Sequence, residues 1–561
     1  MEKKWWQSAV VYQVYPRSFY DSDDDGVGDI RGVIEKLDYI DALGANVIWL
    51  NPIFHSPNDD NGYDISDFYG ISPIFGTMDD VEELIQKAHL RGIKIIFDLV
   101  MNHTSDEHPW FIESRSAQSN FYRDFYIWQD GGPNGEPPTN WEGFFGGSVW
   151  EYDEVSKQYY MHLFSKKMPD LNWTNPDVRE AIYDIARFWS NKGIDGFRVD
   201  AIIHIAKDMT FPQAENLTER PYVLADEYYA NLPKVHDYVQ EFNREVIAPS
   251  NHLMTVGEGS TATVSEGIKY SDPARKEFDM IITFAHLSLD YDYSVTYVPP
   301  KWATKPMDLN AFKAKMMEWQ HGLFGNGWNT LYWNNHDMPR VVSRFGDVGE
   351  YWKESAKMLA TLMYLQWGTP YILQGEELGM TNTNYSDISD YRDVEVFTLY
   401  DQAVVRGGRS HDEIMTMIHD RCRDNARTPM QWDAAEHGGF SHVEPWIKTN
   451  ENYKTINVEA EMNDPDSILN HYRKVLQLRH DYELFIYGTV ELVLEDDERV
   501  YAYIREYEEE RVLVICNFYG TEREIPFTWD VKEVMLSNYD LKTASAGTYL
   551  LRPYESIVYK L

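Results

Sequence analysis

The chain has 561 residues, and its composition excludes several classes of protein. Hydrophobic residues make up 43% of it and aromatic residues 15%, which is enough for a large packed core. Asp and Glu number 91 against 51 Lys and Arg, giving a formal net charge of −40. Because so acidic a chain repels phosphate groups, we expect neither a nucleic-acid partner nor binding to an anionic membrane surface.

Targeting and redox features predict a cytoplasmic protein. The first residues lack the apolar run of a secretory signal, and no apolar stretch reaches the length of about 18 residues that a membrane span requires. Only Cys422 and Cys516 occur, which provides no disulfide framework. We expect a monomer or a weak homo-oligomer.

Short apolar runs alternate with helix-period segments along most of the chain, a pattern that predicts a parallel α/β fold. Thr77 caps a helix that Gly92 ends, and Asn175-Pro176 opens another that ends at Gly193. Eight strands are expected, at residues 10–14, 46–50, 94–100, 196–201, 252–258, 280–285, 329–337 and 370–376. Eight strands in this alternation predict a closed (β/α)8 barrel, a TIM barrel.

Two further units are predicted around the barrel. The gap between the third and fourth strands is far too long for one crossover helix, so residues 104–173 are expected to form an inserted subdomain over one side of the site. The barrel then comprises residues 1–103 and 174–481. From about residue 482 the pattern alternates with period two and lacks a helix signal, which predicts an antiparallel C-terminal β-sandwich over residues 482–561.

Charged side chains stand at the ends of three predicted strands. Arg198 and Asp200 end the fourth strand, Glu258 ends the fifth, and Asp337 ends the seventh. Active sites of such barrels lie at the C-terminal ends of the strands. Three acids in this position suit glycoside hydrolysis, which uses a nucleophile, a proton donor and a charge beside a cationic transition state.

Several short motifs carry a family resemblance. The chain resembles the α-amylase superfamily of glycoside hydrolases (family 13), in its oligo-1,6-glucosidase/α-glucosidase branch, over essentially its whole length. The motifs are Trp5-Trp6, VYQVYPRSF (residues 11–19), DDNGYD (59–64), NHTS (102–105) and ARTPMQW (426–432).

The resemblance implies the catalytic roles. Asp200 would be the nucleophile, and Arg198, two residues earlier on the same face of the strand, would hold it ionised. Glu258 would be the general acid and then the general base, which requires a raised pKa. Asp337 would stabilise the oxocarbenium-like transition state. The carboxyl groups of such a retaining pair lie about 5–5.5 Å apart, and catalysis needs no cofactor.

The resemblance also implies a pocket that is closed at one end. Asp60 would pair with Arg423 and block that end, so that the enzyme acts as an exo-glucosidase that releases one glucose from the non-reducing end. Two aromatic residues would stack on the sugar and two histidines would donate hydrogen bonds to it: Tyr63, Phe164, His103 and His336.

Linkage preference depends on the residue after the nucleophile. Ala201 resembles the α-1,4-preferring enzymes of this branch, because a valine there, which accompanies α-1,6 preference, would crowd the neighbouring subsite. We therefore expect a retaining α-glucosidase of carbohydrate metabolism that prefers maltose and maltooligosaccharides. The alternatives are an oligo-1,6-glucosidase, a transglycosylating or sucrose-isomerising relative, and a hydrolase of a phosphorylated disaccharide, which the acidic composition disfavours. A catalytically inactive, transporter-associated barrel is disfavoured because all three acids are present.

An acidic loop near the N-terminus follows the first part of a calcium-binding loop. Oxygen ligands stand at positions one, three, five and nine, and glycine stands at position six. Gly32 occupies position twelve, where a calcium loop carries a bidentate glutamate. The expected ligands of a structural Ca²⁺ or Mg²⁺ are Asp21, Asp23, Asp25, Val27 and Asp29. The alternative is an acidic turn that binds no metal.

Overall fold

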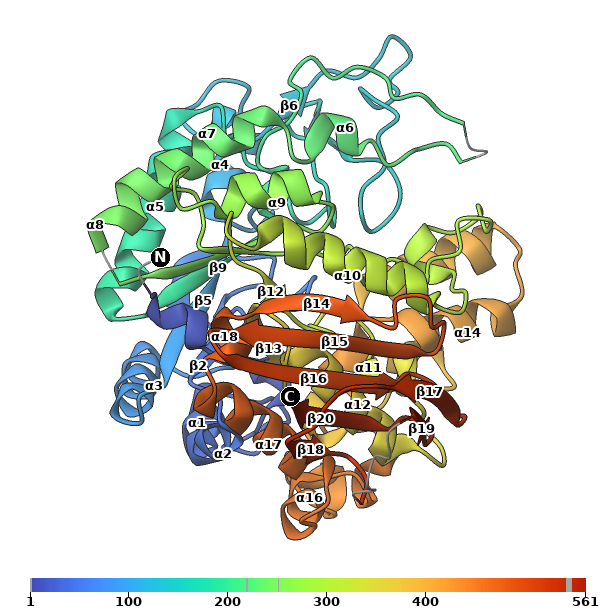
Figure 1. The fold of residues 1–561 in the computed structure, drawn as a ribbon. Coiled ribbons are helices and arrows are strands. Elements are labelled where there is room, and N and C mark those ends of the chain that lie inside the picture. The colour runs from blue at the N-terminus through green and yellow to red at the C-terminus, as the bar shows by residue number, and fades with distance from the viewer. Residues whose placement is uncertain (1–2, 218–219, 251, 541–546) are drawn as a thin grey trace.

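Eight parallel strands form a barrel at the centre of the molecule (Figure 1). The structure is a computed structural model that describes residues 3–217, 220–250, 252–540 and 547–561. The sheet has the order β11-β10-β9-β5-β2-β1-β13-β12, and a parallel bridge between Ile281 and Asn329 closes it. The strands are β1 (Val11–Val14), β2 (Val47–Leu50), β5 (Lys94–Val100), β9 (Gly196–Asp200), β10 (Met254–Glu258), β11 (Met280–Ile282), β12 (Thr330–Leu331) and β13 (Thr369–Leu373).

All eight predicted strands are present, so the prediction of a (β/α)8 barrel is confirmed. Two of them are much shorter than predicted: β11 ends at Ile282 rather than at residue 285, and β12 ends at Leu331 rather than at residue 337. The residues that follow leave the sheet, and Phe284, Ala285, His336 and Asp337 line a cavity instead. Tyr332 and Trp333 are buried elsewhere in the core, so the apolar character of these segments reflects burial rather than strand pairing.

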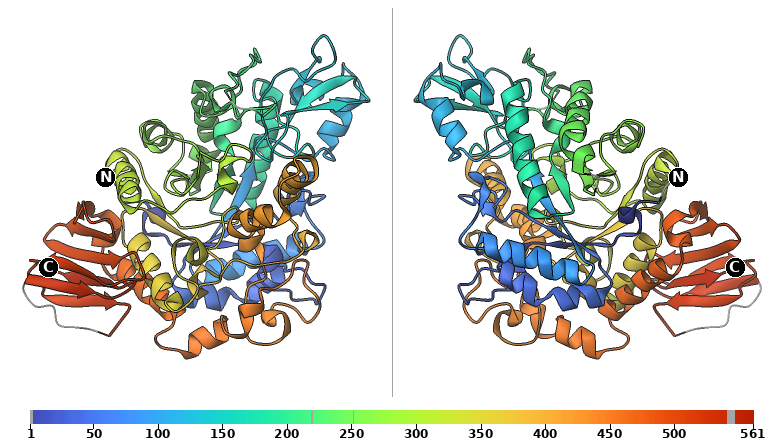
Figure 2. Two further views of the ribbon diagram at one scale, coloured as in Figure 1. Left: turned by 90° about the vertical axis from the view of Figure 1, so that its right-hand side faces the viewer. Right: turned by 90° about the vertical axis from the view of Figure 1, so that its left-hand side faces the viewer.

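Helices cover the outside of the barrel (Figure 2). The two helix starts predicted from capping residues are confirmed, since Thr77 and Asn175 each accept a hydrogen bond from a backbone N–H of the first turn. Gly193 ends the second of these helices with φ +100°, a left-handed conformation that favours glycine. The larger helices are α3 (Met78–Leu90), α5 (Pro176–Lys192), α7 (Pro233–Phe242), α9 (Val264–Ser271), α10 (Leu309–Leu323), α12 (Trp352–Tyr364), α14 (His411–Arg421) and α17 (Ile468–Asp481).

A subdomain is inserted between β5 and β9. It contains α4 (Pro109–Ser116) and a small antiparallel sheet in the order β6-β8-β7. The strands are β6 (Trp128–Gln129), β7 (Trp150–Asp153) and β8 (Gln158–Met161). Figure 2 shows this subdomain and the C-terminal strands at opposite sides of the barrel.

The C-terminal region is an antiparallel β structure, as predicted. A five-stranded sheet and a two-stranded sheet enclose an apolar cluster that includes Leu513, Ile525 and Tyr549. The larger sheet has β14 (Thr489–Val493), β15 (Val500–Tyr507), β16 (Glu510–Asn517), β20 (Ser556–Lys560) and β18 (Glu533–Ser537), and the smaller has β17 (Arg523–Phe527) and β19 (Gly547–Leu551).

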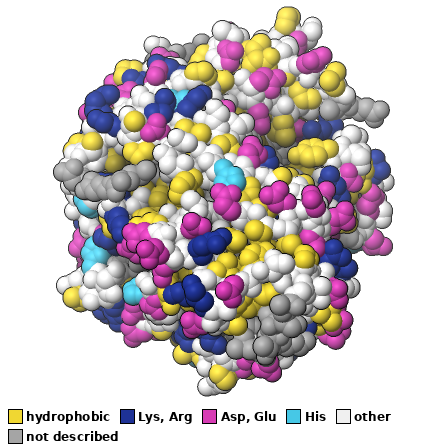
Figure 3. All heavy atoms as spheres, in the orientation of Figure 1, with side chains coloured by type: hydrophobic (Ala, Val, Ile, Leu, Met, Phe, Trp, Pro, Cys, Tyr) yellow, Lys and Arg dark blue, Asp and Glu magenta, His cyan; other side chains and the backbone are white. Residues whose placement is uncertain are grey.

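The surface accommodates the large negative charge by dispersing it. Figure 3 shows Asp and Glu side chains spread over the face, interspersed with Lys and Arg side chains. Among the described residues, no helix combines the length and apolar character that a membrane crossing requires.

A buried ion pair ties the inserted subdomain to the barrel. Lys207, which follows β9, places Nζ 2.9 Å from Oδ2 of Asp170 in the subdomain, and both side chains are 1% exposed or less. Lys207 also donates to the side-chain oxygen of Asn102 at 2.7 Å, and Asn102 in turn donates to Asp170 at 3.1 Å. A buried pair of this kind depends on such hydrogen bonds, because both charges have lost their hydration.

Removing this lysine should destabilise the protein. In Lys207→Met, the carboxylate of Asp170 would stay buried without a counter-charge, and we expect the free energy of unfolding to fall by about 3–5 kcal/mol. Chemical denaturation of both proteins measures the difference. Lys234→Met, which removes an exposed ion pair with Asp237, is the matched control and should change stability by less than about 1 kcal/mol. Equal losses of stability in the two variants would contradict the role of Lys207 as the counter-charge of Asp170.

Candidate active site

A cavity of about 710 Å³ lies at the C-terminal ends of the barrel strands. It brings together residues from β9, β10, the loops after β2, β5 and β12, and the inserted subdomain. Every residue predicted to act in catalysis or substrate binding lines this cavity except Arg198. The lining residues among them are Asp60, Tyr63, His103, Phe164, Asp200, Ala201, Glu258, His336, Asp337 and Arg423.

Arg198 lies beneath the cavity and joins its carboxylates. Its guanidinium is 1% exposed and is 2.6 Å from Asp200 Oδ1 and 2.7 Å from Glu258 Oε2. A third carboxylate, that of Asp98 on β5, accepts from the same guanidinium at 2.5 Å. The neighbouring strands β5, β9 and β10 each contribute one acid, because residues at equivalent positions of parallel strands lie side by side.

This arrangement favours the protonated form of one acid. Burial raises the pKa of Glu258, and Arg198 opposes that effect. Burial also raises the pKa of Asp200, again against Arg198 and with a further contribution from the charge of Glu258. Since two neighbouring carboxylates repel each other, the pair loses its two protons in separate steps and is singly protonated between them.

Asp337 is held ionised by the groups around it. Its Oδ1 accepts from Arg427 Nη2 at 2.8 Å and lies 3.3 Å from Arg423 Nη1. Burial would raise the pKa of Asp337, but His336, Arg423 and Arg427 together lower it below the usual range of an aspartate. The third predicted acid is therefore a permanent negative charge in the cavity.

His336 is neutral and its protonated nitrogen is defined by its neighbours. Burial lowers its pKa to about 3. The amide nitrogen of Gln13 on β1 is 2.8 Å from His336 Nδ1 and can only donate, so the ring proton is on Nε2, which lies 3.1 Å from Asp337 Oδ2. Tyr63 stacks on the ring with centroids 5.0 Å apart. Tyr63 thus lines the cavity while supporting His336.

An ion-pair network lies in the wall of the cavity. Arg423 Nη2 is 2.8 Å from Asp60 Oδ1, as predicted from the resemblance. Burial raises the pKa of Asp60 to about 7, against the opposing effect of Arg423. Asp393, which the sequence did not suggest, holds the same guanidinium through two hydrogen bonds of 2.6 and 3.0 Å. Arg423 is therefore fixed before any sugar binds.

His103 has a free hydrogen-bonding group. Its Nε2 is buried without a partner among the described residues. Burial lowers its pKa to about 4, so the ring is neutral. The ring packs against Phe164 with centroids 5.3 Å apart. Because a buried polar atom without a partner is costly, this nitrogen marks a position where a ligand hydroxyl is expected.

Ala201 has an unusual backbone conformation directly after Asp200. Its φ is +45° and its ψ is +31°, in the left-handed region, where a β-branched residue is strongly disfavoured. Its backbone N–H donates to Glu258 Oε2 at 3.0 Å. The conformation directs this N–H toward the acid and starts the short 3₁₀ helix η4 (Ile202–His204).

Several residues of this site were missed in the sequence. Asp393 holds Arg423 in place, but it comes from another loop, so spacing gave no signal for it. Gln13 and Arg427 belong to two of the motifs that carry the family resemblance, but no role was predicted for either. Asp98 is a charged residue near the end of the apolar strand β5, a signal similar to that of Asp200.

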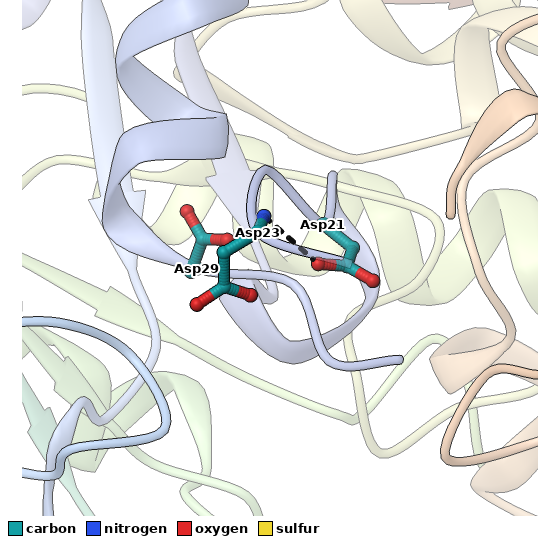
Figure 4. A group of neighbouring side chains, drawn as sticks. All are labelled: Asp21, Asp23 and Asp29. Atoms are coloured by element: carbon teal, nitrogen blue, oxygen red, sulfur yellow. Dashed lines mark hydrogen bonds between the residues drawn. The ribbon is translucent and has the colours of Figure 1, made fainter. Parts of the chain in front are cut away.

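Three residues of the acidic loop form a separate cluster. Carboxylate oxygens of Asp21, Asp23 and Asp29 lie within 4.8 Å of one another (Figure 4). Partial burial and the neighbouring carboxylates raise the pKa of Asp23. An all-oxygen donor set of this type suits Ca²⁺ or Mg²⁺. Asp25 instead accepts from the N–H of Val27 at 2.8 Å and does not belong to the carboxylate cluster. The role of Val27, which would offer its backbone carbonyl, stays a prediction.

Comparisons with known proteins agree with this geometry. Residues 13–488 match the family model "Alpha amylase, catalytic domain", and residues 500–558 match "Alpha-amylase SusG C-terminal domain". The chain is 51% identical to an oligo-1,6-glucosidase of Parageobacillus thermoglucosidasius, with 100% of both chains covered. The chain belongs to the α-amylase family of glycoside hydrolases, in its oligo-1,6-glucosidase/α-glucosidase branch, and is a glycoside hydrolase.

Two similar solved structures carry other activities. A variant of the trehalose-6-phosphate hydrolase of Bacillus licheniformis has 49% identity and a TM-score of 0.93, and the isomaltulose synthase of Klebsiella sp. LX3 has 39% identity and a TM-score of 0.94. In both comparisons 100% of each chain is covered. The α-glucosidase architecture of this chain is therefore shared by enzymes with different sugar substrates.

The acid pair should produce a bell-shaped pH profile of kcat/KM. The singly protonated pair is the form expected to react, so activity rises as the first proton leaves and falls as the second leaves. Because the pKa of Glu258 is raised, its proton is kept at pH values where an ordinary glutamate, with a pKa of about 4.3, has lost it. If kcat/KM already decreased at pH values near the pKa of an ordinary glutamate, the assignment of Glu258 as the acid would be wrong.

Proposed function

We propose that this chain is a retaining, exo-acting glucosidase that hydrolyses α-1,6 links at the non-reducing end of short α-glucosides. The 51% identity to an oligo-1,6-glucosidase supports α-1,6 specificity. The α-1,4 preference that Ala201 suggested has no support from these relatives, and maltose becomes the second candidate substrate. The buried pair of Asp60 and Arg423 in the cavity wall supports exo action, because it would block the cavity beyond one terminal sugar.

The reaction would proceed in two displacements. Asp200 attacks the anomeric carbon and forms a glycosyl ester, while Glu258 donates its proton to the leaving oxygen. Glu258, now a carboxylate, then takes a proton from water, whose oxygen attacks the anomeric carbon and releases Asp200. The shared guanidinium of Arg198 supports these roles, since it holds both carboxyl groups in fixed positions and stabilises whichever is charged.

The terminal glucose would be bound at the closed end. Arg423 and Asp60 offer a fixed donor and acceptor there, and His103 Nε2 is a free polar atom on the wall. Asp337 would stabilise the positive charge that develops on the sugar ring, because its neighbours keep it ionised. His336, a donor through Nε2, and the aromatic surfaces of Tyr63 and Phe164 complete this subsite.

A phosphorylated disaccharide is a weaker candidate, although trehalose-6-phosphate hydrolases are among the relatives. Four cationic side chains line the described cavity, and each is paired with a carboxylate. A phosphate would therefore meet a carboxylate beside each of these cations, and that repulsion opposes its binding. The pairs are Lys301 with Glu395, Lys315 with Glu318, Arg421 with Asp290, and Arg423 with Asp60.

The acidic loop is proposed as a structural Ca²⁺ or Mg²⁺ site, with Asp21, Asp23 and Asp29 as its carboxylate ligands. Their convergence supports this proposal, and the absence of a glutamate at position 32 argues for weak binding. We also propose a cytoplasmic location and a chain that is monomeric or associates weakly. The two free, buried cysteines, Cys422 and Cys516, suit a reducing compartment.

Glucose release from isomaltose and maltose at equal concentration tests the proposed function. We expect a higher kcat/KM for isomaltose. A higher value for maltose would restore the α-1,4 preference, and activity on trehalose 6-phosphate alone would overturn both. Asp200→Asn, which keeps the shape of the side chain but removes the nucleophile, is the control and should lose at least about 10³-fold in kcat.

Thermal denaturation with and without Ca²⁺ tests the metal proposal. Binding to the folded state alone raises stability, so we expect a higher midpoint in Ca²⁺ than in chelator. Asp21→Asn should abolish that difference while keeping activity in the chelated protein. A midpoint that is the same in both buffers for the unaltered chain would identify the loop as an acidic turn.

A further inference from the structure

Four buried polar side chains of the barrel form a hydrogen-bonded network that ends at the cavity residue His336. The members of this amide network are Asp98, Asn51, Gln13 and His336, and each is 2% exposed or less. Three of them come from neighbouring strands: Asp98 lies in β5, Asn51 directly follows β2, and Gln13 lies in β1. The reaction proposed above assigns no role to Asn51 or Gln13.

Asp98 is an acceptor at one end of the amide network. Its Oδ1 accepts from Arg198 at 2.5 Å, and its Oδ2 accepts from the indole Nε1 of Trp49 at 2.8 Å. Both of these neighbours can only donate. Asn51 lies 3.2 Å from the same Oδ2, and an amide oxygen there would face another acceptor. The amide nitrogen of Asn51 therefore points to Asp98, which decides the orientation of this side chain.

The orientation of Asn51 determines that of Gln13 and, through it, the position of the ring proton of His336. With its nitrogen turned to Asp98, Asn51 accepts through Oδ1 from Gln13 Nε2 at 2.9 Å. The second hydrogen on Gln13 Nε2 is available to His336 Nδ1, 2.8 Å away. Nδ1 is then an acceptor, so the ring carries its proton on Nε2, 3.1 Å from Asp337 Oδ2.

The hydrogen bond that Gln13 donates also keeps the ring of His336 neutral. It stabilises only the form of the ring in which Nδ1 has no proton, and burial acts in the same direction, lowering the pKa of His336 to about 3. A protonated ring would put a positive charge beside Asp337 and cancel the negative charge that stabilises a cationic transition state. Gln13 does not line the cavity, so it acts on the reaction only through His336.

We propose that Gln13 is a positioning residue that keeps His336 neutral with its proton on Nε2, so that this N–H faces Asp337 and the terminal sugar. Asn51 and Asp98 hold the Gln13 amide in the orientation that this role requires. The amide network thereby joins two groups of acids, since Asp98 shares a guanidinium with the catalytic pair and Asp337 lies beside the ring. The effect on catalysis rests on the glucosidase activity proposed above, whereas the state of the ring does not.

The ¹⁵N spectrum of His336 tests the proposal without a substrate. A ring nitrogen changes its chemical shift when it gains a proton, and the signals of His336 are those that His336→Gln removes from histidine-labelled protein. In the unaltered chain at neutral pH, we expect a neutral ring protonated on Nε2. In Gln13→Glu, the new carboxylate accepts a proton from Nδ1, so both nitrogens should be protonated. A ring protonated on Nδ1 alone in the unaltered chain, or the same neutral ring in both proteins, would overturn the proposal.

The pH dependence of kcat is a second readout. For p-nitrophenyl α-glucoside at neutral pH, kcat of Gln13→Glu should fall at least about tenfold while KM changes less than about twofold, because the cancelled charge acts in the transition state. Activity should recover as the pH rises through the raised pKa of His336, since the ring is charged only below it. The acidic limb of the profile should therefore move to higher pH, and an unmoved limb would contradict the proposal.

The other charged and titratable groups around the ring are the same in both proteins, so this shift reports the change at position 13. They are Tyr15, Tyr63, Arg198, Asp337, Arg423 and Arg427.

A buried glutamine outside the cavity provides the matched control. Gln320 in α10 is 1% exposed and does not line the cavity, so Gln320→Glu buries the same additional carboxyl group away from His336. It should lose stability but keep the His336 spectrum and the pH profile of the unaltered chain. An equal shift of the profile in this control would overturn the proposal.

A further variant keeps the test decisive if Gln13→Glu does not fold, which thermal midpoints show. Gln13→Leu removes the donor without adding a charge, so the ring should gain its second proton at a higher pH than in the unaltered chain. An unchanged pKa of His336 in this variant would overturn the proposal. If the unaltered chain hydrolyses neither isomaltose nor maltose, the proposed function fails, and the ¹⁵N spectrum still decides the role of Gln13.

Discussion

The charge of one buried guanidinium governs the protonation of the acids in this site. Arg198 contacts three carboxylates, those of Asp98, Asp200 and Glu258, with its side chain almost completely removed from water. A single positive charge cannot neutralise three negative ones. The cluster of Arg198 and its three acids is therefore more stable when one of the acids keeps its proton. The charge balance within the barrel thus favours one neutral acid beside an ionised one.

Two further arginines, Arg423 and Arg427, contact Asp337 rather than the pair of acids held by Arg198. Arg423 and Arg427 hold Asp337 ionised, and Asp60 and Asp393 hold Arg423 in the cavity wall. These contacts are made in the protein alone, so the binding site does not have to be assembled around the substrate. The inserted subdomain contributes other residues to the same cavity, and the buried pair of Lys207 and Asp170 fixes its position.

The sequence predicted what depends on local patterns. Apolar strands that end in charged residues located Asp200 and Glu258, and capping residues located two helix starts. The ends of β11 and β12 were wrong, because residues buried outside a sheet resemble residues buried within one. Asp393, which acts through Arg423, carries no local signal, and the motif that contains Gln13 did not reveal its contact with His336. The linkage preference inferred from Ala201 was not supported, since one side chain does not determine the shape of a wall built from several loops.

Two contacts of the barrel and its cavity join segments that lie far apart in the sequence. Asp60 and Arg423 are 363 residues apart, and β1 pairs with β13 through Val11 and Tyr371. Contacts this distant form late, both in refolding and during synthesis, because the intervening chain must first be made and folded. A chain synthesised only as far as β10 already contains Asp200 and Glu258 but lacks both Arg423 and β13, so its barrel and its cavity are incomplete.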